Sequence, residues 1–176
     1  MPAEAESGEQ RSSTTRRTLG IDPGTARLGY AVVEEVRSTL RLLVGGVLET
    51  PKSLPMPERL LLLFRELSRI VRENAPTEMA VEELFFAKNT TTVISVGQAR
   101  GIALLVAAEA GLPVHEYKPM FVKQAVHGYG LATKDQVGEM VRVLLELQRP
   151  LHPDDASDAA AIAICHLHSA RISGLR

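Results

Sequence analysis

The sequence predicts an α/β fold, a mixed sheet of about five strands with helices on both faces. Three observations support this. Three strand-like segments follow one another across short turns, the apolar pattern then alternates between helical and extended periods, and no internal repeat marks a second domain. Three antiparallel strands continued by helical crossovers give such a mixed sheet.

The chain of 176 residues, 45% apolar, is long enough to bury one full core. We expect a polar, disordered tail over residues 1–17, one domain over 18–172 and a short C-terminal end over 173–176. The tail carries arginines that could touch DNA. Neither a signal peptide nor a long apolar span is recognisable, so we expect a cytoplasmic protein. The single cysteine, Cys165, has apolar neighbours and should be buried.

The first three strands are expected at about 18–23, 28–36 and 40–49. The turn residues Pro23 and Gly24 separate the first pair, and a three-residue link separates the second. Links this short favour antiparallel neighbours.

The second half of the domain alternates helices with strands. An amphipathic helix should begin at Pro57 and end before Pro76, and the apolar segment 79–81 should form a buried strand that leads into Glu82. A second helix is expected over about 90–110, and a fifth strand over 113–117.

Two further helices complete the chain. Thr133 and Gln136 have the spacing of a capping box, which predicts a helix start at Thr133. An alanine-rich helix should run from near Pro153 to about Ser169.

Four carboxylates lie at the ends of these elements. Asp22 closes the first strand, Glu82 closes the fourth, and Asp155 and Asp158 lie three residues apart at the start of the last helix. Oxygen ligands gathered in this way suit hard divalent cations such as Mg²⁺ or Mn²⁺, and two such ions can support phosphodiester hydrolysis. The predicted activity is therefore metal-dependent hydrolysis of nucleic acid.

Each carboxylate also has a simpler interpretation. Asp22 could cap the turn at Pro23, Glu82 could end an exposed strand, and the acids at 154, 155 and 158 could complement a helix dipole. The net charge of −1 argues against a general DNA-coating protein. Acids gathered around metal ions would nevertheless leave a net positive surface for DNA.

Four ordered blocks of sequence carry a resemblance. Residues 20–24 read GIDPG, 81–89 read VEELFFAKN, 97–101 read GQARG and 155–159 read DASDA. In order and spacing they resemble the RuvC family of Holliday junction resolvases over about residues 18–170. The resemblance implies a ribonuclease-H-like fold and a homodimeric bacterial endonuclease of recombination and repair, which resolves four-way DNA junctions by paired symmetric nicks.

The resemblance also implies roles for individual residues. The four metal ligands and catalytic acids fall on Asp22, Glu82, Asp155 and Asp158. Family DNA contacts match Phe85, which would stack on unpaired bases, and the basic residues Lys123 and Lys134. We add Lys88 and Arg100 as an extension of the phosphate track.

Other implications of the family concern partners. It implies a nucleoid location and coupling to the RuvA and RuvB branch-migration proteins. A helix near Gly97 and Gly101 pairs with its mate in the family dimer, although packing within the chain also explains these glycines. His152 lies near the acids and could assist proton transfer, or could simply be a surface histidine.

Several alternatives remain open from the sequence. Actin-like ATPases share a Gly-Ile-Asp-x-Gly loop, but they need a second such half, which this chain lacks. A related nuclease that acts on RNA or on other branched DNA, and a non-catalytic junction-binding protein, are the other candidates.

Overall fold

A computed structural model of the chain describes residues 15–83 and 90–174. The described residues form one five-stranded sheet in the order β3-β2-β1-β4-β5. The strands are β1 (Arg16–Asp22), β2 (Arg27–Val36), β3 (Thr39–Glu49), β4 (Glu78–Glu82) and β5 (Val114–Tyr117). The first three strands are antiparallel, whereas β4 is parallel to β1 and β5 to β4. The predicted mixed sheet is confirmed.

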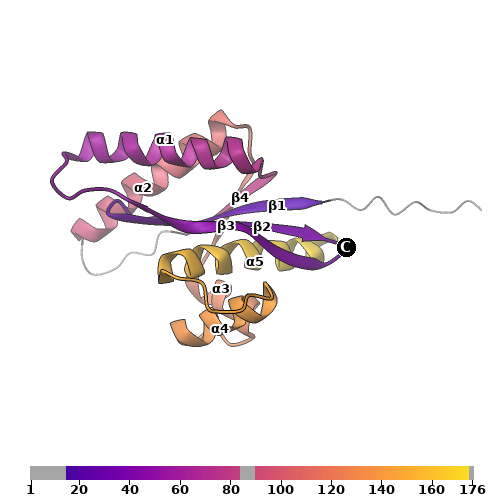
Figure 1. Cartoon of the computed structure of the whole chain (residues 1–176). Helices are drawn as coiled ribbons and strands as arrows, with labels where there is room; N and C mark the ends of the chain where they lie inside the picture. The colour runs from indigo at the N-terminus through magenta and orange to yellow at the C-terminus, as the bar shows by residue number, and fades with distance from the viewer. Residues whose placement is uncertain (1–14, 84–89, 175–176) are drawn as a thin grey trace, which may run out of the picture.

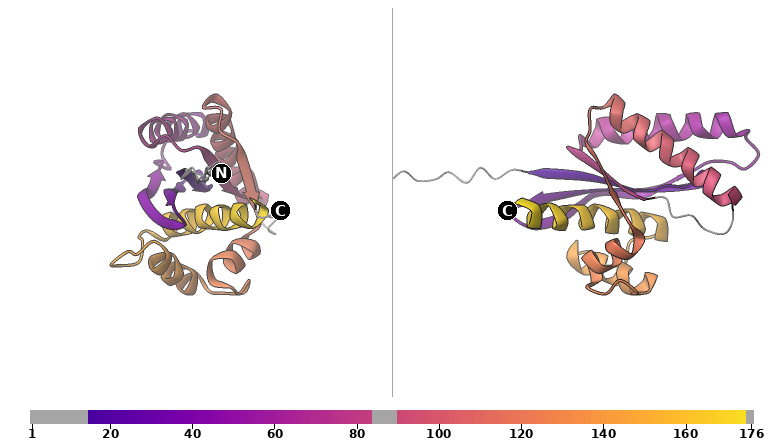
Figure 2. Two further views of the ribbon diagram at one scale, coloured as in Figure 1. Left: turned by 90° about the vertical axis from the view of Figure 1, so that its right-hand side faces the viewer. Right: turned by 180° about the vertical axis from the view of Figure 1, so that it is seen from behind.

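In the described part of the chain, five helices cover the two faces of this sheet. They are α1 (Met56–Asn74), α2 (Thr90–Glu109), α3 (Pro119–His127), α4 (Lys134–Leu144) and α5 (Asp154–Gly174). Helices α1 and α2 lie on one face, and α5 lies on the other with α3 and α4 outside it (Figure 1, Figure 2). Within the described ranges, none of these helices has the length and apolar character needed to cross a membrane.

Two apolar cores fill the space between the sheet and its helices. Because side chains alternate along a strand, Leu19 and Ile21 of β1 and Val32 of β2 pack towards α1 and α2. Ala31 and Val33 of β2 pack on the opposite face, against α5 and its neighbours. Each face of the sheet therefore has its own core.

Helix α5 lies unusually close to the sheet. A Cβ at Gly20 of β1 would lie 2.0 Å from the Ala159 carbonyl oxygen, and one at Gly29 of β2 would lie 2.1 Å from the Asp155 carbonyl oxygen. These glycines allow the helix backbone to contact the strands directly. The start of α5 is thereby held over the end of β1.

Some boundaries differ from those predicted. Strand β1 begins at Arg16, two residues inside the expected tail, because Arg16 and Arg17 bond to acidic side chains of neighbouring strands. Helix α3 has nine residues and was not predicted, since so short a segment carries little periodic signal. The capping box at Thr133 is confirmed, with both of its hydrogen bonds present. Cys165 is buried, as expected.

Candidate active site

Two of the four predicted carboxylates lie at the same edge of the sheet. Asp22 is the last residue of β1, and Glu82 is the last residue of β4. The two strands are adjacent and parallel, with Ile21 paired to Val81, so the next residue on each strand is one of these acids. The carboxyl ends of neighbouring parallel strands meet at one edge, which is where α/β enzymes bind ligands.

The other two carboxylates come from the first turns of α5. Asp155 and Asp158 are three residues apart, so they share one side of the helix. The close contact between the Asp155 backbone and Gly29 holds this end of α5 against the strands, and Gly29 is the register partner of Asp22. The chain thus gathers all four acids from three elements far apart in sequence.

The gathered acids repel one another electrostatically. Burial raises the pKa of Asp22 to about 7, and the charges of Glu82, Asp158 and Asp155 contribute to this rise, while Lys134 acts in the opposite direction. Burial and the charge of Asp158 also raise the pKa of Glu82. Asp22 is therefore the centre of an excess of negative charge.

Two cations of the chain offset part of this charge. The Lys134 ammonium lies 2.7 Å from Asp158 Oδ2, and the Arg27 guanidinium lies 2.7 Å from Asp155 Oδ2. Arg27 also lies 3.4 Å from Glu49. Among the described residues, no Lys, Arg or His forms an ion pair with Asp22 or Glu82.

Arg27 was not singled out from the sequence. It is the first residue of β2, and only the tight antiparallel return after Asp22 brings it back to the start of α5. The shortness of the Pro23–Ala26 link was the available signal that Arg27 would lie near this edge of the sheet.

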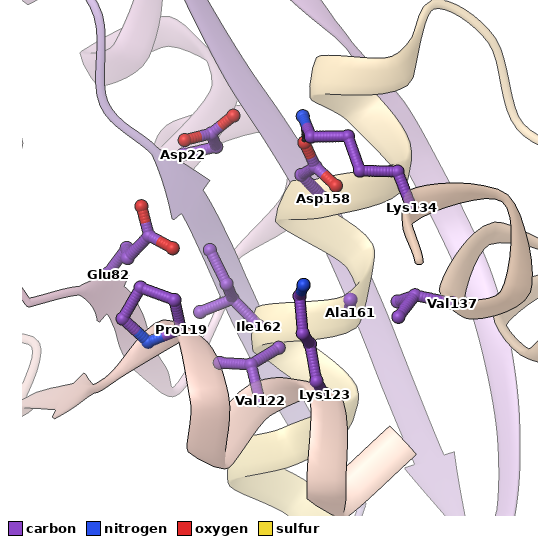
Figure 3. Close-up of a pocket in the computed structure, with 10 residues that line it drawn as sticks. All are labelled: Asp22, Glu82, Pro119, Val122, Lys123, Lys134, Val137, Asp158, Ala161 and Ile162. Atoms are coloured by element: carbon purple, nitrogen blue, oxygen red, sulfur yellow. Dashed lines mark hydrogen bonds and ion pairs between the residues drawn. The ribbon is translucent and has the colours of Figure 1, made fainter. Parts of the chain in front are cut away.

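Asp22, Glu82 and Asp158 line a cleft of about 260 Å³, whereas Asp155, which pairs with Arg27, is not among the residues that line it. Figure 3 shows Asp22, Glu82 and Asp158 directed from three elements towards a common space, with Lys123 of α3 and Lys134 of α4 beside it. Apolar side chains complete the wall, namely Pro119, Val122, Val137, Ala161 and Ile162. The cleft therefore combines an acidic centre with lysines, a combination suited to a phosphodiester.

The remaining predicted residues are Phe85, Lys88, Arg100 and His152. Phe85 and Lys88 fall outside the described residues. Arg100 of α2 forms an ion pair with Glu116 of β5, and its side chain is 16% exposed. His152 is exposed and lies 3.7 Å from Asp154. It lines a second hollow that shares Lys134 and Asp158 with the cleft, and it is not among the residues lining the cleft itself.

The donor set of the cleft fits a hard divalent cation. All four ligands would be carboxylates, the oxygen donors that Mg²⁺ and Mn²⁺ prefer. Burial, together with the charges of the neighbouring acids, raises the pKa of Asp22, and a bound cation would offset both effects.

Comparison with known proteins matches this arrangement to one family. The family model described as crossover junction endodeoxyribonuclease RuvC matches residues 18–166. The chain is 55% identical over 157 residues to the protein of that name from Roseiflexus sp. (strain RS-1), covering 89% of this chain and 94% of the relative. It is 56% identical over 154 residues to that of Desulfitobacterium hafniense, covering 88% and 93%.

Solved structures give the same result. The structure of T. thermophilus RuvC in complex with a Holliday junction substrate superposes with a TM-score of 0.85 at 39% identity, covering 90% of this chain and 96% of that one. The yeast mitochondrial Holliday junction resolvase Ydc2, at 18% identity and a TM-score of 0.65, shares the fold. The ribonuclease-H-like fold expected from the sequence is confirmed.

Proposed function

Because the chain belongs to the RuvC family and is a Holliday junction resolving endonuclease, we propose that it cuts by paired symmetric nicks at the cleft lined by Asp22, Glu82 and Asp158, with Asp155 as the fourth acid one helical turn before Asp158. The observation that supports this assignment is the convergence of these acids at one edge of the sheet, beside two lysines. We propose a single nuclease domain over 18–172, to which β1 adds Arg16 and Arg17 and α5 adds residues 173–174.

The family depends on a metal for cleavage. We infer that the four carboxylates hold two ions, either Mg²⁺ or Mn²⁺. The chemistry that such bound ions supply is activation of water and neutralisation of charge on the phosphate oxygens. The chain's contribution is a set of oxygen donors fixed before substrate arrives, because the strands set two donors and α5 sets the other two.

The lysines orient the DNA strand in this proposal. Lys123 and Lys134 line the cleft from α3 and α4, so a phosphate lying over the acids would be within their reach. Lys134 pairs with Asp158, and its positive charge lowers the pKa of Asp22 and of Glu82, so it also favours the ionised form of these acids. Phosphate contacts of this kind position the backbone and carry no sequence information.

Three further DNA contacts are proposed from the family match. Phe85 would stack on bases unpaired at the crossover, and Lys88 and Arg100 would follow the phosphate backbone. Arg100 would have to exchange its Glu116 partner for a phosphate to do so.

We propose that the active species is a homodimer formed through α2. The side chains of Ile94 and Leu105 are 58% and 54% exposed, and the exposed Gln98 and Gly101 continue the same side of the helix. Within the described ranges, a Cβ at Gly101 would meet no atom within 4 Å, so packing against these residues does not account for this glycine. A two-fold dimer would present one cleft to each of two opposing strands of a junction.

Association with RuvA and RuvB at the bacterial nucleoid completes the proposal. It rests on family membership alone. Co-sedimentation of the chain with RuvA and RuvB on junction DNA tests it.

The assignment of the site is tested by cutting an immobile four-way junction and a linear duplex of the same sequence, with Mg²⁺ or Mn²⁺. We expect Asp22→Asn, Glu82→Gln, Asp155→Asn and Asp158→Asn each to abolish nicking while junction binding persists, because the phosphate contacts remain. Glu83→Gln is the matched control, since Glu83 is exposed and follows Glu82 directly. Near wild-type cutting by two of the four variants would refute the site. Cutting of the linear duplex at an equal rate would favour a nuclease of broader substrate range.

A further inference from the structure

A second group of potential metal ligands lies at the opposite end of the sheet from the carboxylate cleft. Glu78 is the first residue of β4, whereas Glu82 of the cleft is the last. His115 comes from β5, and His166 comes from α5. His166 is eight residues beyond Asp158, a rise of about 12 Å along the helix.

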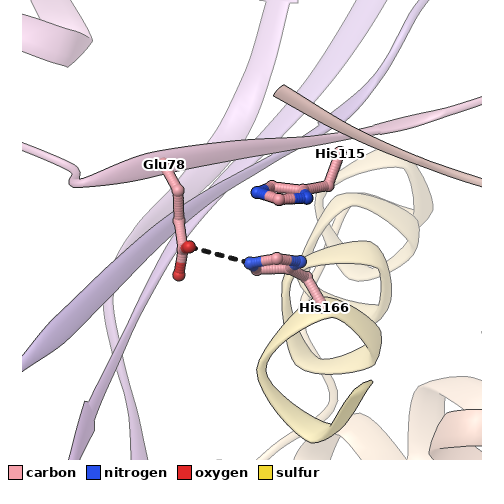
Figure 4. A group of neighbouring side chains, drawn as sticks. All are labelled: Glu78, His115 and His166. Carbon is pink, nitrogen blue, oxygen red and sulfur yellow. Dashed lines mark ion pairs between the residues drawn. The ribbon is translucent and has the colours of Figure 1, made fainter. Parts of the chain in front are cut away.

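The three side chains converge. One potential ligand atom from each residue lies within 4.8 Å of the other two. His166 Nε2 lies 2.9 Å from Glu78 Oε2, and the His115 ring stacks on the His166 ring with centroids 4.2 Å apart. Figure 4 shows both imidazoles with a nitrogen on the side of Glu78. Two imidazoles and one carboxylate are the ligand set of many three-ligand zinc sites.

A neighbouring residue orients one of the imidazoles. The Tyr117 hydroxyl lies 2.7 Å from His166 Nδ1. When Nδ1–H donates to this hydroxyl oxygen, the lone pair on Nε2 faces Glu78, which is the tautomer that a metal requires. His166 is only 3% exposed, so its ring is held in this orientation by the packing around it.

A cation of the chain already lies against two of the three side chains. The Arg16 Nη2 nitrogen donates to Glu78 Oε1 at 2.9 Å and Oε2 at 3.0 Å, and lies 3.4 Å from His166 Nε2. The Arg16 side chain is 28% exposed, so it can leave towards solvent. The Thr18 hydroxyl, which also donates to Glu78 Oε1, keeps the carboxylate in place.

We propose that Glu78, His115 and His166 form a site for Zn²⁺, or a divalent ion of similar ligand preference, which displaces the Arg16 guanidinium. The site is separate from the cleft and differs from it in chemistry, because nitrogen ligands favour zinc over magnesium. A bound ion would join β4, β5 and α5 at the end of the sheet where β1 begins.

The test uses the full chain, stripped of metals with a chelator and then returned to Mg²⁺ buffer. Co²⁺ is titrated by visible absorption, and Zn²⁺ by calorimetry and by competition with Co²⁺. We expect one Co²⁺ site with absorption typical of nitrogen and oxygen ligands, displaced by Zn²⁺. His115→Phe keeps a stacking ring but removes the nitrogen, and should weaken binding at least 10-fold, whereas His152→Ala, at an exposed histidine, should not.

Two further variants distinguish a metal site from a purely structural ion pair and from the nuclease cleft. Asp22→Asn should leave Co²⁺ affinity unchanged, which separates this proposal from the proposed nuclease site. Arg16→Gln should tighten binding several-fold, because the competing cation is gone. If Arg16 and Glu78 form only a structural pair, Arg16→Gln would lower thermal stability without any gain in metal binding. That outcome, or equal Co²⁺ affinity in wild type and His115→Phe, would overturn the proposal.

Discussion

Replacing Asp22 by asparagine should stabilise the fold while abolishing cleavage. Asp22 is the acid most strongly affected by burial and by its three acidic neighbours, and its pKa rises from 3.8 to about 7. A shift of this size, at 1.36 kcal/mol per unit, corresponds to a penalty of about 4 kcal/mol for holding the charge in the folded state. Asparagine nearly matches aspartate in shape and removes the charge.

The penalty depends on pH in a defined direction. The folded state holds the Asp22 proton more tightly than the unfolded chain does, so stability falls as the pH rises between 3.8 and about 7. Below this window both states are protonated and the penalty is absent. Above it the penalty is complete. The advantage of Asp22→Asn should therefore be largest near pH 8 and should be smaller by about 2–3 kcal/mol near pH 5.

The measurement is thermal unfolding followed by circular dichroism, with a chelator present. Asparagine retains part of the desolvation cost, so we expect a gain of about 2 kcal/mol near pH 8, or roughly 4–8 °C in Tm. Added Mg²⁺ should raise the Tm of wild type more than that of Asp22→Asn, because it binds the intact acidic site. Glu83→Gln serves as the control and should leave the Tm unchanged. Equal Tm values for wild type and Asp22→Asn near pH 8, or a difference that does not shrink at pH 5, would refute the electrostatic argument.

Three other outcomes follow from the structure. Lys123→Ala and Lys134→Ala should each lower junction affinity and reduce the slope of log affinity against log salt by about 1, measured by fluorescence anisotropy; unchanged slopes would place these lysines outside the DNA contact. Arg27→Gln should lower the Mg²⁺ concentration for half-maximal nicking by about 2–5-fold, because the exposed Arg27–Asp155 ion pair competes weakly with the metal for Asp155. A higher Mg²⁺ requirement would mean that Arg27 positions Asp155 instead. Leu105→Glu should give a folded monomer in sedimentation, whereas the control Val143→Glu, at a similarly exposed site on α4, should stay dimeric. A dimeric Leu105→Glu would show that this face of α2 is not the dimer interface.

Much of the fold could be predicted because its signals are local. Short turns and alternating apolar residues marked the first three strands, and a side-chain capping pattern marked the start of α4 at Thr133. The acids at the strand ends were recognisable because burying a charged residue next to an apolar strand is costly unless a cation or hydrogen bonds offset its charge. Their convergence depended on β1 and β4 being neighbours, which the sequence only suggested and the sheet order confirms.

What could not be predicted depends on contacts between distant segments. Arg27 is an ordinary strand residue in the sequence, and its pair with Asp155 spans 128 residues. Glu78, His115 and His166 are isolated single residues without motif spacing, so only the packed sheet and α5 bring them together. Sequence patterns report on periodicity within one element, and these groups arise between elements.

Gly20 and Gly29, which lie beneath α5, bring no reactive group to the site. They affect the site by allowing the backbone of α5 to approach the strands closely. The Ala159 carbonyl would lie 2.0 Å from a Cβ at Gly20, so α5 can reach its observed depth only over a residue without a side chain. Asp158 directly precedes Ala159 on the helix, and Asp22 lies two residues beyond Gly20 on the strand. The separation between these two acids is therefore set by the same backbone contact. Metal ligands must be held to within about 0.5 Å of their working positions. Gly20 is therefore as necessary to the proposed site as Asp22.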